Sequence, residues 1–335
     1  MSYAKEKEKA EEKVRRAKRI VLFIVVILIA ALCVFSFFFP VSEWKYYVGK
    51  PKVGKRQKDE MRIHFIDVGQ GDATLIELPD GKIILIDGGN GKQKTAKTLL
   101  RYLNALDVDT IDYLVLTHSD SDHCGGLDKV VKYKKIKYAY IPNTSETLNA
   151  EYEQFYTELM DTDCVCEYAT RSAQFKNADQ ELYTLQMIAP HSLSVEGTMD
   201  AEVAANMMSA VVWLDYKGVS AVFTGDIPIK SETSLIAEDK LGAFDKKGVK
   251  LDSTEILKVA HHGSQYSTSK EFVEYLGVKT AVISCGAFNS YGHPSVEALG
   301  VLSDAGVNTY RTDLKGHVII NVSAEGQYTV ETVKS

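Results

Sequence analysis

The hexapeptide His118-Ser119-Asp120-Ser121-Asp122-His123 is the feature that most constrains how this chain can fold. An apolar run that is typical of a buried strand, residues 111–117, precedes it, and Cys124-Gly125-Gly126-Leu127 follows, where two glycines permit a tight turn into a helix. A strand that ends in a tight loop aims His118 and Asp120 at one point, while Asp122 and His123 can serve a second point nearby. Imidazole and carboxylate groups around two points predict two metal ions. The alternative is a helix start with Asp and Ser caps and two chance histidines.

The amino-terminal part contains an uncharged apolar run over residues 20–39. About 20 apolar residues match the hydrocarbon thickness of a bilayer, so this run predicts a transmembrane anchor. A cleaved signal peptide is the alternative, but the run is long and Phe37-Phe38-Phe39-Pro40 offers no small-residue cleavage site. Basic residues lie on both sides of the run, with a small excess before it. This excess favours a cytoplasmic amino terminus, a single-pass cell-membrane protein and an external catalytic domain.

Composition divides the chain into a polar charged tail (1–19), the anchor (20–39), a linker (40–60) and a folded domain (61–335). The chain has 25% charged and 45% hydrophobic residues, which excludes general disorder. The whole chain carries a net charge of −6 and the tail +4, so the remainder carries −10. An acidic domain does not attract nucleic acid by bulk charge, so any polyanionic substrate would be drawn by the metal ions.

Cysteine usage points away from a disulfide-stabilised domain. Five cysteines in this length do not make a disulfide framework. Cys164 and Cys166 are two residues apart, which on a strand places both on one face. We expect them to be ordinary buried or half-buried thiols rather than a redox or zinc pair.

Hydrophobic periodicity predicts one domain built from two packed sheets flanked by helices. The predicted strands are 62–68, 73–78, 82–87, 111–117, 138–141, 182–189, 210–216, 219–223, 255–260, 279–284 and 317–322. The predicted helices are 94–106, 127–133, 147–160, 228–240, 269–276 and 295–305.

Three further loops could reach the metal ions. Asp226, beside Gly225 at a strand end, is placed to bridge two cations, or else to cap the following helix. His261 and His262 follow a strand and should point to opposite sides, so that at most one is a ligand and the other could donate to a substrate oxygen or a leaving group. His293 precedes a helix whose amino terminus could help to hold a phosphate. The remaining histidines, His64, His191 and His317, are expected to be structural or solvated.

With these loops assembled, the chain resembles the metallo-β-lactamase superfamily, and within it the hydrolase domain of ComEC-type competence proteins. The resemblance covers residues 61 to about 322 and rests on six ordered motifs. These are residues 65–72, 85–89, 116–127, 224–226, 258–264 and 291–294.

The resemblance implies an αββα sandwich with a dinuclear site at one sheet edge, holding two divalent ions, Zn²⁺ or Mn²⁺. Carried over by position, His118 and Asp120 would bind one ion, Asp122 and His123 the other, Asp226 would bridge and His262 would complete the set. His261 and His293 would lie beside the substrate. The residues expected in supporting or substrate-contacting positions are Asp87, below the metal loop, Gln70 and Asp72, at the rim, and Ser264 and Asn206.

Two departures from the superfamily pattern bear on function. Asp120 stands where most members have histidine, which makes the site harder and more anionic and suits phosphodiesters better than lactams. The usual third-motif histidine is missing, and Asn206 is the only candidate to replace it, so one metal ion could be weakly held. The channel-forming segments of full competence proteins are also missing, so a role in DNA import does not follow from the resemblance.

These features predict a membrane-anchored, metal-dependent hydrolase, first of all a phosphodiesterase or nuclease with DNA among its candidate substrates. One alternative is an esterase for a cell-envelope phosphoester, such as teichoic acid or phosphocholine. Another is a non-catalytic module that binds metal or a polyanion. The lipid bilayer is the other expected partner, through residues 20–39, and no protein partner can be inferred from the sequence.

Overall fold

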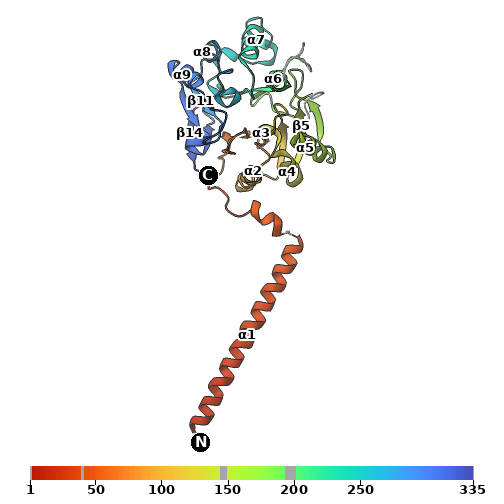
Figure 1. Ribbon diagram of the computed structural model, residues 1–335, viewed down its shortest axis with the longest axis vertical. Coiled ribbons are helices and arrows are strands. Elements are labelled where there is room, and N and C mark those ends of the chain that lie inside the picture. The colour runs from red at the N-terminus through yellow and green to blue at the C-terminus, as the bar shows by residue number, and fades with distance from the viewer. Residues whose placement is uncertain (1, 39–40, 144–148, 193–200, 335) are drawn as a thin grey trace. The chain divides into compact units, whose positions relative to one another are not determined.

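The computed structural model describes residues 2–38, 41–143, 149–192 and 201–334, and divides the chain into two compact units, Met1–Gly49 and Lys50–Ser335. The first unit consists of helix α1 (Ser2–Phe38) and the short 3-10 helix η1 (Val41–Tyr46). Of the helices described, α1 is long and apolar enough to cross a membrane (Figure 1). At a rise of 1.5 Å per residue, its apolar part spans about 28 Å, close to the thickness of a hydrocarbon core.

The second unit is built around two sheets. The first has eight strands in the order β14-β13-β1-β2-β3-β4-β5-β6, and the second has six in the order β12-β11-β10-β9-β8-β7. The strands are β1 Met61–Phe65, β2 Thr74–Glu77, β3 Ile83–Ile86, β4 Thr110–Val115, β5 Lys135–Ile141, β6 Val165–Tyr168, β7 Thr184–Ala189, β8 Val211–Tyr216, β9 Val219–Phe223, β10 Ile256–Lys258, β11 Thr280–Ile283, β12 Asn308–Arg311, β13 His317–Val322 and β14 Tyr328–Val333.

Helices cover the outer faces of both sheets. In Figure 1, α2, α4 and α5 lie together near β5, while α7, α8 and α9 lie together beyond β11. The helices are α2 Gln93–Ala105, α3 Ser121–Cys124, α4 Leu127–Tyr133, α5 Ala150–Met160, α6 Ala201–Met207, α7 Ile229–Lys240, α8 Lys270–Leu276, α9 Val296–Asp304 and α10 Thr312–Lys315, with 3-10 turns η2 Asp245–Lys247, η3 Leu251–Ser253 and η4 Ala260–Gly263.

Successive side chains of a strand point to opposite faces of the sheet, and this alternation explains the layered packing. In β8, Val212 and Leu214 belong to the core between the two sheets, while Val211 and Trp213 belong to the core between the second sheet and its helices. A strand that is buried on both faces reads as a continuous apolar run, as β8 does. The αββα sandwich predicted from the sequence is therefore confirmed.

Parallel strand order decides where the functional loops meet. Strands β3 to β6 run parallel to one another in the first sheet, and β9 to β12 do so in the second. Loops that leave the carboxyl ends of parallel strands emerge at one edge, which is where open sheets bind ligands. The hexapeptide follows β4, Asp226 follows β9, and the two adjacent histidines follow β10, so residues distant in sequence come together.

Three strands were not predicted from the sequence: β6, β12 and β14. Each of them lies at the edge of its sheet. Edge strands have one hydrogen-bonded neighbour and are partly exposed, so they carry fewer apolar residues and a weaker signal. The predicted helix 147–160 begins at Ala150 among the described residues, and its first two predicted positions lie outside them.

Candidate metal centre

The loop after β4 brings His118 and His123 together as buried side chains, with their ring centroids 4.1 Å apart. His118 Nε2 lies 3.5 Å from Asp120 Oδ2, and Asp122 lies on α3, one residue before His123. The carboxylate of Asp120 is 31% exposed and that of Asp122 is 26% exposed, whereas both imidazoles are buried. The hexapeptide therefore places its histidines in the interior and its carboxylates nearer the solvent.

The glycines after the hexapeptide act through close approach rather than through a special backbone angle. A Cβ atom at Gly125 would lie 2.1 Å from the backbone nitrogen of Gly91, and one at Gly126 would lie 2.2 Å from the carbonyl oxygen of Gly88. Neither Gly125 nor Gly126 has a positive φ. The predicted turn into a helix is present, since residues 125 and 126 lie in a turn directly before α4, and the absence of a side chain lets the metal loop pack directly against the loop after β3.

Asp226 reaches the same point from β9. Its Oδ1 lies 3.4 Å from His123 Nε2, and its Oδ2 lies 3.5 Å from His262 Nε2. Gly225 before it has φ +52°, and a Cβ there would press against the side chains of Thr117 and Ser209. The backbone N–H of Asp226 donates to Ser209 Oγ at 3.2 Å, which fixes the turn that delivers the carboxylate.

His261 and His262 lie in a loop, as predicted, but their rings do not point to opposite sides. Strand β10 ends at Lys258, and both histidines have left-handed backbones, with φ +50° and +54°. Two successive non-glycine residues in this region are strained, and such strain persists only where the surroundings hold it. As a result both rings face Asp226 rather than opposite sides. His262 is buried and lies 3.1 Å from Asp122, whereas His261 is partly exposed and lies 3.8 Å from Asp226 Oδ2.

The chemistry of the assembled donors fits divalent metal ions. Two groups of three donors each converge within 4.8 Å: His118, His123 and Asp226, and Asp122, His123 and His262. Four buried atoms in these groups have no hydrogen-bond partner, namely His118 Nε2, His123 Nε2, His262 Nε2 and Asp226 Oδ1. A buried polar atom without a hydrogen-bond partner lowers the stability of the fold by about 1–3 kcal/mol. Four such atoms close together therefore indicate a binding site for a ligand. The structure brings together all six residues that the sequence analysis proposed as metal ligands.

Asp87, expected below the metal loop, holds His123 from behind. Its Oδ2 accepts from His123 Nδ1 at 2.9 Å, and its Oδ1 accepts from the backbone N–H of Thr117 at 2.8 Å. A carboxylate on the far nitrogen of a histidine fixes the ring and leaves Nε2 free for a metal ion.

We expect Asp87→Asn to weaken metal binding by about 10- to 100-fold, because the amide no longer fixes the His123 ring. Metal content after dialysis against graded chelator measures this. Asp112→Asn is the matched control, since Asp112 is also a buried carboxylate that accepts a backbone N–H, from Ile83, but lies outside the donor groups. Equal metal retention in the two variants would contradict the role of Asp87.

Asp72 does not lie at the rim, where it was expected. It is 3% exposed, and its carboxylate contacts the ammonium group of Lys258 and lies 3.4 Å from His262 Nδ1. Lys258 is itself 3% exposed, donates to the carbonyl of Gly225 and lies 3.7 Å from Asp226 Oδ1. No role was predicted for Lys258, although a lysine within an apolar run three residues before His261 is a signal for one.

The other residues proposed around the site have structural partners. Gln70 Oε1 accepts from the backbone N–H of Gly286, which ties the rim to the loop after β11. Ser264 is buried and its hydroxyl accepts from Tyr266 N, so it shapes the histidine turn. Asn206, on α6, is buried and its Oδ1 has no hydrogen-bond partner. Of the remaining histidines, His64 and His317 are buried and hydrogen-bonded, and His191 is 70% exposed.

The pKa of His262 makes the stability of the metal-free protein depend on pH. Burial acts to lower this pKa, but the carboxylates of Asp226 and Asp72 outweigh burial and raise it to about 10 from 6.5. A histidine with a raised pKa contributes stability that is fully present below its unfolded pKa and is lost as pH rises through the folded value. Metal binding also requires the neutral ring, so protons and metal compete.

We therefore expect the unfolding free energy of the metal-free protein to fall between about pH 6.5 and pH 10. We also expect metal affinity to be higher at pH 8 than at about pH 6. Urea unfolding in chelator and metal titration at each pH measure the two effects. A metal-free protein that gains stability over the alkaline range would contradict this assignment.

The fold and the donor set can now be compared with known proteins. The model of the metallo-beta-lactamase superfamily matches residues 66–287 of this chain. The chain belongs to this superfamily of metal-dependent hydrolases, whose fold binds divalent metal ions, typically two.

Within the superfamily, the chain is similar to competence proteins. It is 29% identical over 276 residues to ComE operon protein 3 of Bacillus subtilis (strain 168), which covers 77% of this chain and 33% of that protein. It is 28% identical over 259 residues to Competence protein ComA of Neisseria gonorrhoeae, with 77% and 32% covered. The chain thus spans about a third of the length of these relatives. The predicted family and the predicted resemblance to ComEC-type proteins are confirmed.

A solved structure with a similar fold is the Zn(2+)-bound PqqB of Methylobacterium extorquens. It is 7% identical, has a TM-score of 0.43 and covers 79% of this chain and 99% of that chain.

Proposed function

We propose that this protein is a membrane-anchored phosphodiesterase that uses two divalent metal ions, with nuclease activity as its specific form. The observation that carries the proposal is the convergence of the two donor groups around His123, with four buried donor atoms that no protein group satisfies. When bound, divalent ions supply a water molecule of lowered pKa and polarise phosphoryl oxygens.

The balance of donors supports a phosphodiester substrate. Three carboxylates and three imidazoles make a harder and more anionic set than the histidine-rich set usual in the superfamily, because Asp120 replaces a histidine. Oxygen ligands favour hard ions such as Mn²⁺, which in turn favour phosphoryl oxygens. Whether Zn²⁺ or Mn²⁺ fills the site is part of the proposal's test.

The histidines beside the donor groups are suited to donate hydrogen bonds. Burial, aided by the nearby His262, lowers the pKa of His293 to about 4, and burial also lowers the pKa of His261. Both rings are therefore neutral at neutral pH and lie 5.4 Å apart, centroid to centroid. Neutral imidazole N–H groups at this position would stabilise charge that develops on a substrate or leaving-group oxygen.

The anchor and the substrate remain linked proposals. Helix α1 would hold the domain at the bilayer, with the catalytic unit outside the cell. The names of the relatives, competence proteins among them, make DNA the first substrate to test. The charge of −10 outside the tail favours a less anionic substrate, such as a cell-envelope phosphoester, as the second candidate.

The test uses the full-length protein in detergent, stripped of metal and reloaded with Mn²⁺ or Zn²⁺. Turnover of bis(p-nitrophenyl) phosphate, single-stranded DNA and p-nitrophenyl phosphorylcholine is measured with and without chelator. We expect metal-dependent turnover, with DNA preferred. Preference for phosphorylcholine would support the envelope candidate. Tight metal binding without turnover of any ester would overturn the enzymatic proposal.

A further inference from the structure

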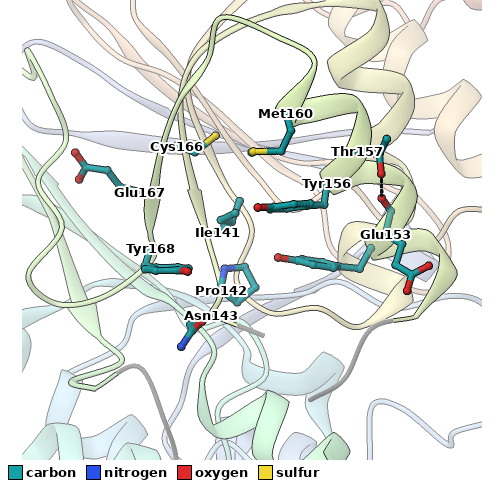
Figure 2. A pocket seen from close by; sticks show the side chains of 11 residues that line it. Ile141, Pro142, Asn143, Glu153, Tyr156, Thr157, Met160, Cys166, Glu167 and Tyr168 are labelled. Atoms are coloured by element: carbon teal, nitrogen blue, oxygen red, sulfur yellow. Dashed lines mark hydrogen bonds between the residues drawn. The ribbon is translucent and has the colours of Figure 1, made fainter. Parts of the chain in front are cut away.

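A second pocket, of about 620 Å³, lies between α5 and the end of β6, outside the metal centre. Figure 2 shows Tyr156 and Tyr168 edge-on at opposite sides of it, with their hydroxyl groups turned inward toward Ile141 and Pro142. Tyr156 is 42% exposed and Tyr168 is 51% exposed. A volume of this size is typical of small-molecule sites.

The pocket lies at the same sheet edge as the metal centre. Tyr168 is in register with Ile141, the neighbour of Tyr140, and Tyr140 is in register with Val115, three residues before His118. At about 4.8 Å between strands, the end of β6 lies about 10 Å across the sheet from the end of β4. A polymer whose phosphate lies at the metal centre could therefore place a neighbouring unit in the pocket.

A side chain also connects the pocket wall to the metal loop. Asn149 caps α5 by accepting from Tyr152 N at 2.7 Å, and its amide donates to the carbonyl of Ser119 at 2.6 Å. Ser119 stands between the proposed ligands His118 and Asp120. The helix that carries Tyr152 and Tyr156 is thus tied directly to the loop that would hold the metal ions.

The lining residues define what the pocket can accept. Tyr152 and Tyr156 stack at 6.1 Å with an interplanar angle of 20°, which makes a flat aromatic wall. Among the described lining residues, Glu153 and Glu167 carry charge and none is a lysine or arginine. Figure 2 shows both carboxylates turned away from Ile141 and Pro142, and Glu167 pairs with Lys176 at 3.2 Å. The pocket is therefore unsuited to phosphate, and it suits a flat, uncharged ring that stacks on the exposed tyrosines.

We propose that this pocket binds a nucleobase of a single-stranded substrate, next to the phosphodiester at the metal centre. The proposal rests on the proposed phosphodiesterase function and names its substrate class. Aromatic rings stack on any base, and each such contact contributes substantially to affinity for single strands.

The test compares the double variant Tyr156→Ala/Tyr168→Ala with Tyr156→Phe/Tyr168→Phe in the full-length, metal-loaded protein. We expect the alanine variant to raise KM for oligodeoxycytidylate about tenfold with kcat within about twofold, because stacking is lost. The phenylalanine variant keeps the rings and should retain a low KM. Tyr47→Ala, at a tyrosine 46% exposed in the first unit, is the control for loss of a surface ring. A KM unchanged by alanine would overturn the proposal.

Binding of free deoxycytidine, measured by saturation-transfer NMR in chelator, separates this inference from the proposed function. If the wild type cleaves no phosphodiester but deoxycytidine binds and the alanine variant loses that binding, the function fails and the pocket assignment stands. If the wild type cleaves DNA but deoxycytidine does not bind, the pocket assignment fails alone. Binding of choline in place of deoxycytidine would also overturn it, since the tyrosines would then form a cation site.

Discussion

Replacing Asp122 with alanine is expected to lower the turnover of bis(p-nitrophenyl) phosphate in Mn²⁺ by about a thousandfold or more, because a metal position loses its carboxylate. The carboxylate lies 3.1 Å from His262 Nε2 and 4.0 Å from His123 Nε2. Burial acts to raise the pKa of Asp122, but the two imidazoles outweigh it and hold this pKa well below its ordinary range. The group is therefore an anion at neutral pH, as a metal ligand must be.

The fold of the Asp122→Ala variant should survive, because the side chain is 26% exposed and its removal leaves no large cavity. Asp163→Ala, at an exposed aspartate in the turn before β6, is the control and should keep full turnover. Metal content measured on the same samples shows whether the loss comes with loss of an ion. Undiminished turnover in the Asp122 variant would refute the assignment of the site.

Replacing Lys258 with methionine is expected to destabilise the metal-free protein by about 3–5 kcal/mol, because a buried carboxylate loses its partner. Burial acts to lower the pKa of Lys258, but Asp72 and Asp226 raise it above its ordinary value, so the ammonium group is charged. It contacts Asp72 and lies 3.7 Å from Asp226. Without it, two buried carboxylates face each other with only imidazoles between them.

Urea unfolding in chelator measures this effect, with two comparisons. Lys279→Met removes a lysine that is 64% exposed and pairs with Glu255, and should change stability by less than about 1 kcal/mol. The double variant Asp72→Asn/Lys258→Met removes charge from both members of the closer pair and should recover much of the loss, since Asp226 keeps the imidazoles of His123 and His262. If Lys258→Met were as stable as Lys279→Met, the buried ion pair would not have the structural role inferred here.

Asp122 and Lys258 differ in whether their contacts could be predicted from local sequence motifs. Asp122 lies in a compact hexapeptide whose donors are adjacent in sequence, so its proximity to His123 could be predicted directly. Lys258 and Asp72 are 186 positions apart, and only the packing of β10 beside β9 and of the loop after β1 against the metal loop brings them together. No local pattern records such a pairing, and for that reason Asp72 was placed at the rim.

The backbone conformation at His261 and His262 is a second feature that the sequence alone could not predict. Adjacent histidines at the end of a strand were expected to turn their rings to opposite sides. The observed left-handed turn depends on contacts made elsewhere in the chain, such as the bond from His261 N to the carbonyl of Gly225. Such strained geometry is not a preference of histidine, so propensity could not predict it.

By itself, the sequence determined the apolar run near the amino terminus and the central strands, and it identified the six proposed metal ligands, because each rests on local composition or on spacing along one element. Only the tertiary structure decided which residues are buried behind those donors, how the two histidines turn, where the edge strands pair, and that a tyrosine-lined pocket shares the edge of the metal centre. The physical reason is that burial and pairing between distant segments depend on how the sheets stack, and stacking is a property of the whole fold.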